Sequence, residues 1–207
     1  MSKLAHKANV FCMNIRLDME DKSLIQDTID LCLHLHKKNK NVGLAIQTNM
    51  FRTKNDIVNL MSKNISLRLV KGAYKEDITS AYQKQEQIKK LFIQNAFTIL
   101  SDRCRTYYYM KDTHKVIPAI GTHDEEIIDE ITKNMGAFNI NKEDCDFEFL
   151  YGIRRDLSQR MKDEGYQVRL YVPFGTEWLP YTLRRLKEYK NLMFVVTNMI
   201  KEWKGNK

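Results

Sequence analysis

The run VGLAIQ, Val42–Gln47, decides the fold of this chain, because it stays apolar until its last residue. A strand without polar alternation is typical of a parallel sheet that is covered on both faces. Further strand candidates lie at residues 10–18, 65–71, 116–122, 147–150 and 167–173. No hairpin turn signal joins neighbouring candidates, and segments with helical periodicity separate them. The pattern therefore predicts a parallel sheet with helical crossovers.

The segments between the strand candidates show the apolar spacing of helices. We expect helices at about residues 21–38, 54–62, 79–103, 124–135, 154–164 and 191–203, with another opened by Pro180. This alternation fits an open doubly wound sheet or a (βα)8 barrel. A barrel normally has eight strands and about 250 residues, whereas this chain has 207 residues. Against the open sheet, the glycine-rich dinucleotide-binding and phosphate-binding motifs are absent.

The carboxyl end of every strand candidate carries a side chain that is capable of binding or acid–base chemistry. In chain order these side chains are Asp18, Gln47, Arg68 with Lys71, Thr122 with His123, Glu148, and Tyr171. Barrel enzymes place their active site at the carboxyl ends of several strands. The recurrence favours the barrel.

Composition predicts one well-cored domain over residues 1–207, with 43% hydrophobic and 29% charged residues. We expect a cytosolic protein, because no apolar run could span a bilayer and the N-terminus lacks a signal-peptide pattern. The four cysteines form no C-x-x-C pair, so we expect no disulfides and no structural zinc site. The net charge of +8 is scattered, without interleaved aromatic residues. It disfavours nucleic-acid binding and leaves open attraction to an anionic membrane surface.

Lys71 and His123 each have a functional and a structural interpretation. A lysine at a strand end is a Schiff-base nucleophile in some enzymes, binds phosphate in others, and is often a solvated charge. Gly72 and Ala73 tip the balance slightly toward a ligand, because small residues let it approach the backbone. A histidine such as His123 more often satisfies a cap or a core contact than it catalyses, although its strand-end position favours function.

The segment YVPFGTEWLPYTLRRLKE, residues 171–188, passes from the last strand into a helix whose first turn suits Pro180. Leucines form one stripe of this helix. The opposite face holds, at spacings of three and four, Tyr181, Arg184, Arg185 and Glu188. Periodicity alone assigns this polar face to solvent.

Six segments together resemble proline dehydrogenase in their order and spacing. They are RLDMED, AIQTNMFRT, RLVKGAY, GTHDEEII, FEFLYGI and the C-terminal segment quoted above. The resemblance covers nearly the whole chain and is greatest to the short monofunctional bacterial enzymes. It implies a distorted, TIM-barrel-like (βα)8 fold holding FAD. The implied reaction oxidises L-proline to Δ1-pyrroline-5-carboxylate and passes electrons to a membrane quinone. Because this acceptor lies in the membrane, the resemblance also implies that the protein contacts the inner face of the membrane peripherally.

The resemblance implies a proline site built largely on the C-terminal helix. Arg184 and Arg185 would clamp the proline carboxylate, since planar guanidinium groups suit that task, and Glu188 would hold one of them. The walls around the substrate ring would be Tyr171, Tyr181 and Leu150. A tyrosine at position 171 fits proline better than hydroxyproline, because it fills the space that a ring hydroxyl needs.

For FAD, the resemblance implies that Arg68 approaches flavin N5 and Gln47 the pyrimidine edge. Asp18 would support Arg68 from the neighbouring strand. The remaining FAD contacts would be Lys71, Gly72, Ala73, Tyr74, Thr122, His123 and Glu148. The family usually has glutamine where this chain has Glu148, so an extra negative charge is implied near the flavin.

The first two barrel strands of the family have no counterpart here, which implies an incomplete α/β barrel with about strands 3 to 8. A substrate-binding lysine and an acidic gate partner also come from the missing region. Two exposed edges would result, and a second chain or a second copy is expected to complete the barrel. The alternatives to a working enzyme are a catalytically inactive remnant, one part of a split barrel acting as an interaction module, and, more distantly, an aldolase-like lyase using Lys71.

Overall fold

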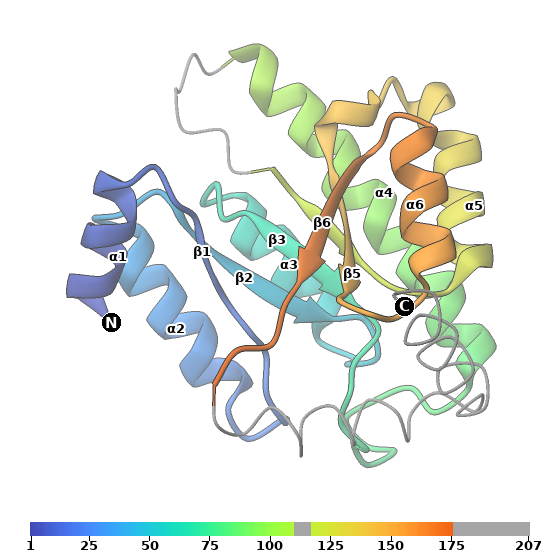
Figure 1. Cartoon of the computed structure of the whole chain (residues 1–207). Helices are drawn as coiled ribbons and strands as arrows, with labels where there is room; N and C mark the ends of the chain where they lie inside the picture. Colours follow the sequence, from blue (N-terminus) through green and yellow to red (C-terminus); the bar gives the residue numbers. More distant parts are fainter. Residues whose placement is uncertain (110–116, 176–207) are drawn as a thin grey trace.

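The computed structural model describes residues 1–109 and 117–175, and of residues 102–109 only the backbone (Figure 1). The strands are β1 (Ile15–Leu17), β2 (Val42–Gln47), β3 (Leu67–Val70), β4 (Ala119–Gly121), β5 (Asp146–Leu150) and β6 (Gln167–Tyr171). The α-helices are α1 (Ser2–Val10), α2 (Ile25–His36), α3 (Thr53–Met61), α4 (Gln85–Tyr109), α5 (Glu125–Met135) and α6 (Arg155–Asp163). Two short 3-10 turns, η1 (Gly136–Phe138) and η2 (Lys142–Asp144), lead into β5.

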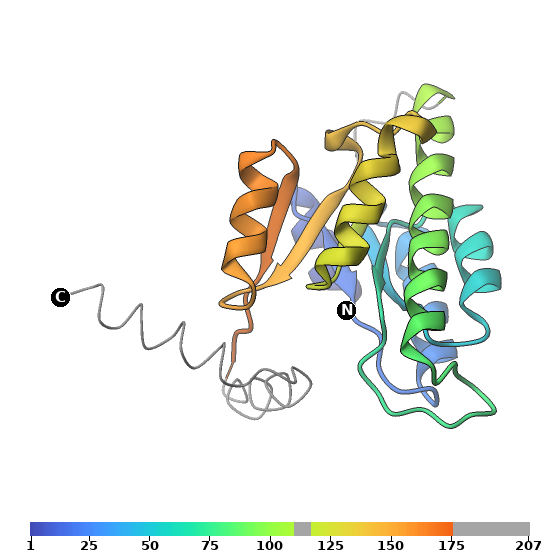
Figure 2. The ribbon, with the colours of Figure 1, turned by 90° about the vertical axis from the view of Figure 1, so that its right-hand side faces the viewer.

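These six strands form one parallel sheet whose spatial order is their order in the chain, β1-β2-β3-β4-β5-β6. A doubly wound sheet reverses its strand order at a switch point. This sheet instead advances in one direction and curls into a half-barrel, with the helices outside the curl (Figures 1 and 2). The predicted incomplete, TIM-barrel-like α/β fold is therefore confirmed, and the open doubly wound sheet is excluded.

Strand β2 is buried at every position, as its apolar sequence predicts. Its Leu44 and the adjacent Leu67 of β3 belong to the main hydrophobic core. Helices α2 and α3 pack on β2, α4 packs on β3, and α6 packs on β6. Phe92 of α4 and Phe147 of β5 are fully buried in this core. Truncating either to alanine is expected to cost about 3–5 kcal/mol.

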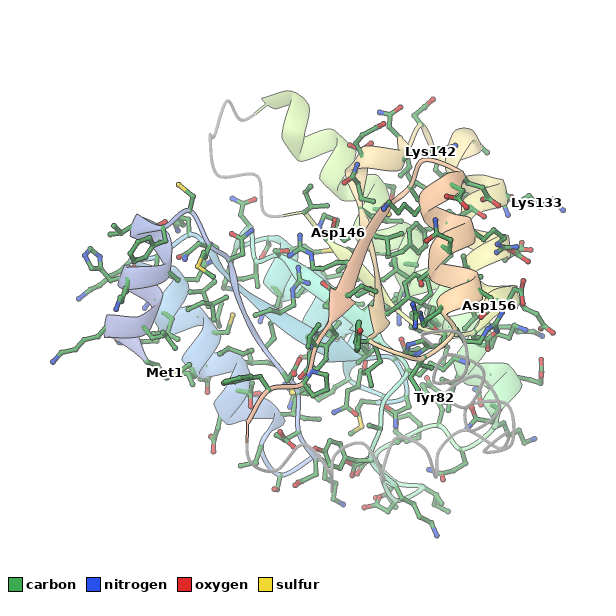
Figure 3. The ribbon with its side chains drawn as sticks, viewed as in Figure 1. Met1, Tyr82, Lys133, Lys142, Asp146 and Asp156 are labelled. Atoms are coloured by element: carbon green, nitrogen blue, oxygen red, sulfur yellow. The ribbon has the colours of Figure 1, made fainter. Side chains whose placement is uncertain are left out.

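Successive side chains along a strand point to opposite faces of the sheet. The charged side chains of the strands therefore lie together on the face inside the curl. Its large charged side chains include Arg16 on the edge strand β1, Arg68 on β3, and Asp146 and Glu148 on β5. Their register partners in adjacent strands include the small residues Gly43, Ala45, Ala119 and Gly121. Figure 3 shows Asp146 beside β6. The small partners leave room inside the curl for long charged side chains.

Most predicted boundaries differ from the structure; three starts are wrong by four to six residues, and helix α4 ends at Tyr109 rather than near residue 103. The strand expected at residues 10–18 begins at Ile15, because the preceding residues form α1 and bury Ala5 against the core. Helix α4 begins at Gln85, not near Thr79, since Thr79 closes a turn by donating its N–H to Asp77 Oδ1 at 3.0 Å. Helix α2 begins at Ile25 and not at residue 21. The helices expected at 191–203 and after Pro180 lie outside the described residues.

Cys12 and Cys32 are free thiols, and burial raises the pKa of Cys32 to about 12. Cys145 is buried. The side chain of Cys104 is not among those described. Over residues 1–109 and 117–175, no helix has the length and apolar character needed to cross a membrane. The same residues contain no group of three or more His, Cys, Asp or Glu side chains able to hold a metal ion.

Candidate functional site

The carboxyl ends of the strands gather at one rim of the half-barrel, because all the strands are parallel. Residues predicted for the site lie at this rim or up to two residues before it, from β1 to β6. They are Asp18 after β1, Gln47 on β2, Arg68 on β3, Thr122 after β4, Glu148 and Leu150 on β5, and Tyr171 on β6.

Arg68 lies between two carboxylates inside the curl. Its Nη1 is 3.2 Å from Glu148 Oε2, and its Nη2 forms an ion pair with Asp18. Asp18 therefore contacts Arg68 as expected, but not from the neighbouring strand, because β2 lies between β1 and β3. The small Gly43 and Ala45 on the inner face of β2 leave space for the two side chains to meet above it.

Glu148 binds a second guanidinium group, that of Arg16. Arg16 Nη1 lies 2.5 Å from Glu148 Oε1. Arg16 Nη2 donates to Ser66 Oγ at 3.3 Å and to the Ile117 carbonyl at 3.2 Å. Burial lowers the pKa of Arg16, and the Glu148 carboxylate acts against that shift. Sequence reasoning missed Arg16, although strand alternation placed it on the same face as Asp18, two residues later.

Tyr171 belongs to the same cluster. Its hydroxyl donates to Asp18 Oδ2 at 3.0 Å, and the guanidinium carbon of Arg68 lies 5.4 Å from its ring centroid. Leu150 is its register partner on β5. Two of the three wall residues expected for the substrate site, Leu150 and Tyr171, are therefore adjacent on the inner face of the sheet.

Three consecutive buried residues at the end of β2 have a polar atom without a hydrogen-bond partner. These atoms are Gln47 Oε1, Thr48 Oγ1 and Asn49 Oδ1. Gln47 Nε2 donates to the Glu20 carbonyl at 2.6 Å, which fixes the amide with its oxygen unpaired. Arg68 Nε is buried without an acceptor. Because an unpaired buried polar atom costs about 1–3 kcal/mol, this grouping indicates a ligand site with donors and acceptors in place.

The segment that leaves β3 comes close to these unpaired atoms. Gly72 has a φ of +113°, and a Cβ at this position would lie 2.1 Å from Asn49 Oδ1. Only glycine fits both the backbone conformation and the close approach. Ala73 is exposed, and the Tyr74 hydroxyl donates to the Glu20 carboxylate.

Lys71, Thr122 and His123 have contacts within the protein. Lys71 Nζ lies 2.5 Å from Asp124 Oδ2. The Asp124 N–H donates to Thr122 Oγ1 at 3.2 Å. His123 Nε2 accepts the Leu150 N–H at 2.8 Å, which joins the ends of β4 and β5 and requires an unprotonated Nε2. Lys71 is thus bound to a carboxylate and not held in the apolar pocket that a Schiff-base lysine needs, which disfavours the aldolase-like alternative.

Acid is expected to weaken the fold partly through Asp124. Burial raises the pKa of Asp124, but the hydrogen bond and charge of Lys71 lower it more, so the net shift is below the usual 3.8. A depressed folded-state pKa stabilises the fold above about pH 4, and this contribution is lost as the pH falls through the folded value. Asp124→Asn should therefore flatten the fall of the unfolding temperature below pH 4. Asp30→Asn, on the exposed side of α2, is the control, and identical pH profiles for the two variants would contradict the assignment.

The four site residues predicted on the C-terminal helix, Tyr181, Arg184, Arg185 and Glu188, lie outside the described residues. Their roles stay predictions.

The fold defines an α/β protein of the incomplete (βα)8-barrel class, and a candidate site with charged side chains lies toward the carboxyl ends of its strands. The family model for proline dehydrogenase matches residues 1–196. The chain therefore belongs to the proline dehydrogenase family.

Two curated relatives are similar over nearly the whole of this chain. The proline dehydrogenase of Deinococcus radiodurans is 33% identical over 202 residues, which cover 96% of this chain and 61% of the relative. Proline dehydrogenase 2 of Bacillus subtilis strain 168 is 32% identical over 203 residues, which cover 98% of this chain and 63% of the relative. The chain thus spans less than two thirds of the length of these relatives.

Solved structures of proline utilization A show the same fold at low identity. The protein from Bdellovibrio bacteriovorus, inactivated by N-propargylglycine, matches with a TM-score of 0.72 at 22% identity, over 89% of this chain and 22% of that one. A mutant from Bradyrhizobium japonicum matches with a TM-score of 0.74 at 21% identity, over 90% of this chain and 20% of that one. The half-barrel is therefore a segment of a fold that occurs within much longer chains.

Proposed function

We propose that this chain acts as an FAD-dependent proline dehydrogenase, which oxidises L-proline to Δ1-pyrroline-5-carboxylate and passes the electrons to a membrane quinone. We also propose that this protein is cytosolic and contacts the inner face of the membrane when it delivers electrons. Family membership supports the reaction. The observation that carries the proposal is the pair of unpartnered buried atoms at the rim, Gln47 Oε1 and Arg68 Nε.

The residues at the rim fit the polar edge of a flavin ring. That edge has an N–H that needs an acceptor, and carbonyl oxygens and a ring nitrogen that need donors. Gln47 Oε1 is an available acceptor, and Arg68 Nε is an available donor. The residues proposed to hold FAD are Gln47, Arg68, Lys71, Gly72, Ala73, Tyr74, Thr122, His123 and Glu148. When bound, FAD would accept the hydride from the proline ring carbon next to nitrogen.

The chain's own residues would bind and orient the substrate beside that ring. Asp18 accepts the hydrogen bond of Tyr171 and so holds the orientation of its hydroxyl. Leu150, the register partner of Tyr171, would give an apolar wall for the methylene groups. Four further residues are proposed to complete the site. Arg184 and Arg185 would bind the proline carboxylate with their guanidinium groups, and the other two are Glu188 and Tyr181.

The open half-barrel favours a second candidate, a chain that completes its barrel with a partner. Within the described residues, β1 and β6 each pair with one strand only. Each therefore presents unpaired backbone N–H and C=O groups to a further strand. A second copy, or another chain, that supplied strands would cover both edges. Without FAD, this candidate is an inactive remnant that serves as an interaction module.

The visible absorption spectrum of the purified chain, followed by anaerobic addition of L-proline, tests the proposal. A flavin spectrum that bleaches with L-proline but not with D-proline supports the dehydrogenase. A colourless chain that takes up no added FAD contradicts it and favours the interaction module. Light scattering on the same sample then shows whether two copies associate.

A further inference from the structure

We propose that Arg16 and Glu148 are a positioning pair, which fixes the Arg68 guanidinium at the cofactor site and balances the charge around it. The inference rests on the proposed FAD site. It gives a role to Arg16, which is not among the expected FAD or proline contacts. It also gives a reason for a glutamate at position 148.

The terminal nitrogens of Arg68 are both engaged. Nη1 faces Glu148 Oε2 at 3.2 Å, and Nη2 is paired with Asp18 on the other side. Each Nη atom carries a second N–H, and Nε, with its single N–H, is buried without a partner. Because a guanidinium is planar, fixing its two Nη atoms also fixes the direction of its Nε–H bond. The pair of carboxylates therefore sets the direction in which the Nε–H bond faces a ligand.

Glu148 keeps this position because Arg16 binds its other oxygen. The Arg16 Nη1 to Glu148 Oε1 distance is 2.5 Å. Arg16 is held in turn by Ser66 Oγ and by the Ile117 carbonyl. The order Arg16–Glu148–Arg68–Asp18 thus joins β1, β5 and β3 across the inside of the curl. A shift of Arg16 would move Glu148 and, through it, Arg68.

The same four side chains carry two positive and two negative charges, which sum to zero. The side chains of Arg16, Glu148 and Arg68 are 13%, 6% and 12% exposed, so solvent screens their charges poorly. A neutral glutamine at position 148 would leave a net charge of one positive unit. Glu148 therefore offsets the charge of Arg16, which would otherwise add to that of Arg68 beside the flavin.

The experiment compares Glu148→Gln, Arg16→Met and the double variant, each as the full chain loaded with FAD. Glu148→Gln adds a positive unit, so it should stabilise the reduced, anionic flavin relative to the oxidised form by on the order of tenfold. Arg16→Met adds a negative unit and should destabilise the reduced form by a similar factor. In the double variant the charges balance, and the flavin midpoint potential should return close to its original value.

Asp146→Asn is the matched control. Asp146 lies on the same strand and face as Glu148, but its carboxylate pairs with Arg169 at 2.5 Å and not with Arg68. Its substitution should therefore shift the potential less than Glu148→Gln does. A second readout needs no FAD: each single substitution removes one member of the buried Arg16–Glu148 pair and leaves the cluster of four side chains with an unbalanced charge. The single variants should therefore unfold at lower temperature than the double variant.

Opposite shifts in the two single variants that cancel in the double variant support the inference. Shifts of the same sign, or shifts no larger than that of Asp146→Asn, overturn it while the proposed FAD site stands. Single variants as stable as the double variant show that the pair is not coupled, and they also overturn it. Failure of the unsubstituted chain to take up FAD overturns the proposed function itself, and the inference falls with it.

Discussion

Replacing Arg68 with methionine is expected to abolish FAD uptake and to lower the free energy of unfolding by about 1–3 kcal/mol. The substitution keeps the length of the side chain and removes its charge. Among the described residues, Glu148 then keeps Arg16 as its cation, and Asp18, whose side chain is 44% exposed, loses its ion pair. The cost is below that of isolating a fully buried charge, because Glu148 stays compensated and solvent screens Asp18. The unpaired donor Nε is lost as well.

Arg52→Met is the matched control for this substitution. Arg52 pairs with Asp56 four residues later on α3, and its side chain is 39% exposed. Such a helix pair contributes about 0.3–0.5 kcal/mol. Urea denaturation followed by far-UV circular dichroism gives both free energies, and titration with FAD gives the affinities. If Arg68→Met and Arg52→Met unfold at the same urea concentration, the charged inner face does not hold the sheet together in the way described above.

The sheet was predictable because its signals are local. The apolar run of β2 marks a strand with both faces covered, and every residue of β2 is buried. The absence of hairpin signals excludes antiparallel neighbours, and all five strand pairings are parallel. In a parallel sheet the carboxyl ends must share one edge, so side chains at strand ends are brought together without any knowledge of the tertiary contacts.

Contacts between distant segments were not predictable in the same way. Arg16 and Glu148 are 132 residues apart, and Arg68 and Glu148 are 80 residues apart. The family pattern indicates that Glu148 adds a negative charge near the flavin, but the structure pairs that charge with two guanidinium groups. Strand alternation gives the face of Arg16. It does not give the carboxylate that Arg16 meets, because the curl of the sheet determines which strands face each other.

The helix at the N-terminus was missed for a local reason. In α1 the buried residue is Ala5, so the segment lacks the stripe of large apolar residues that identifies an amphipathic helix. The turns before α4 were mistaken for helix because the side chain of Asp77, which accepts from the N–H and hydroxyl of Thr79, stabilises a turn that apolar periodicity does not reveal.

Gly72→Ala is the other substitution expected to have a large effect, lowering the free energy of unfolding by about 2–4 kcal/mol. A φ of +113° is unfavourable for alanine, and its Cβ would lie 2.1 Å from Asn49 Oδ1. The contact is with the buried side-chain amide of Asn49, so this amide or the segment after β3 has to shift to relieve it. The segment after β3 and the end of β2 both carry residues of the proposed FAD site. The affinity for FAD should therefore fall at least about tenfold, which corresponds to a loss of about 1.4 kcal/mol in binding free energy.

Gly165→Ala separates the cost of the unfavourable backbone conformation from the cost of the steric clash. Gly165 has a φ of +84° with nothing within 4 Å of an added Cβ, so alanine there bears the backbone cost of about 1 kcal/mol without a clash. The double variant Gly72→Ala/Asn49→Ala should recover the steric part of the loss and not the backbone part. Urea denaturation of the four chains, including the unsubstituted one, measures both parts. Equal losses in Gly72→Ala and Gly165→Ala would show that the segment after β3 does not press on the end of β2, and the proposed FAD site depends on that close approach.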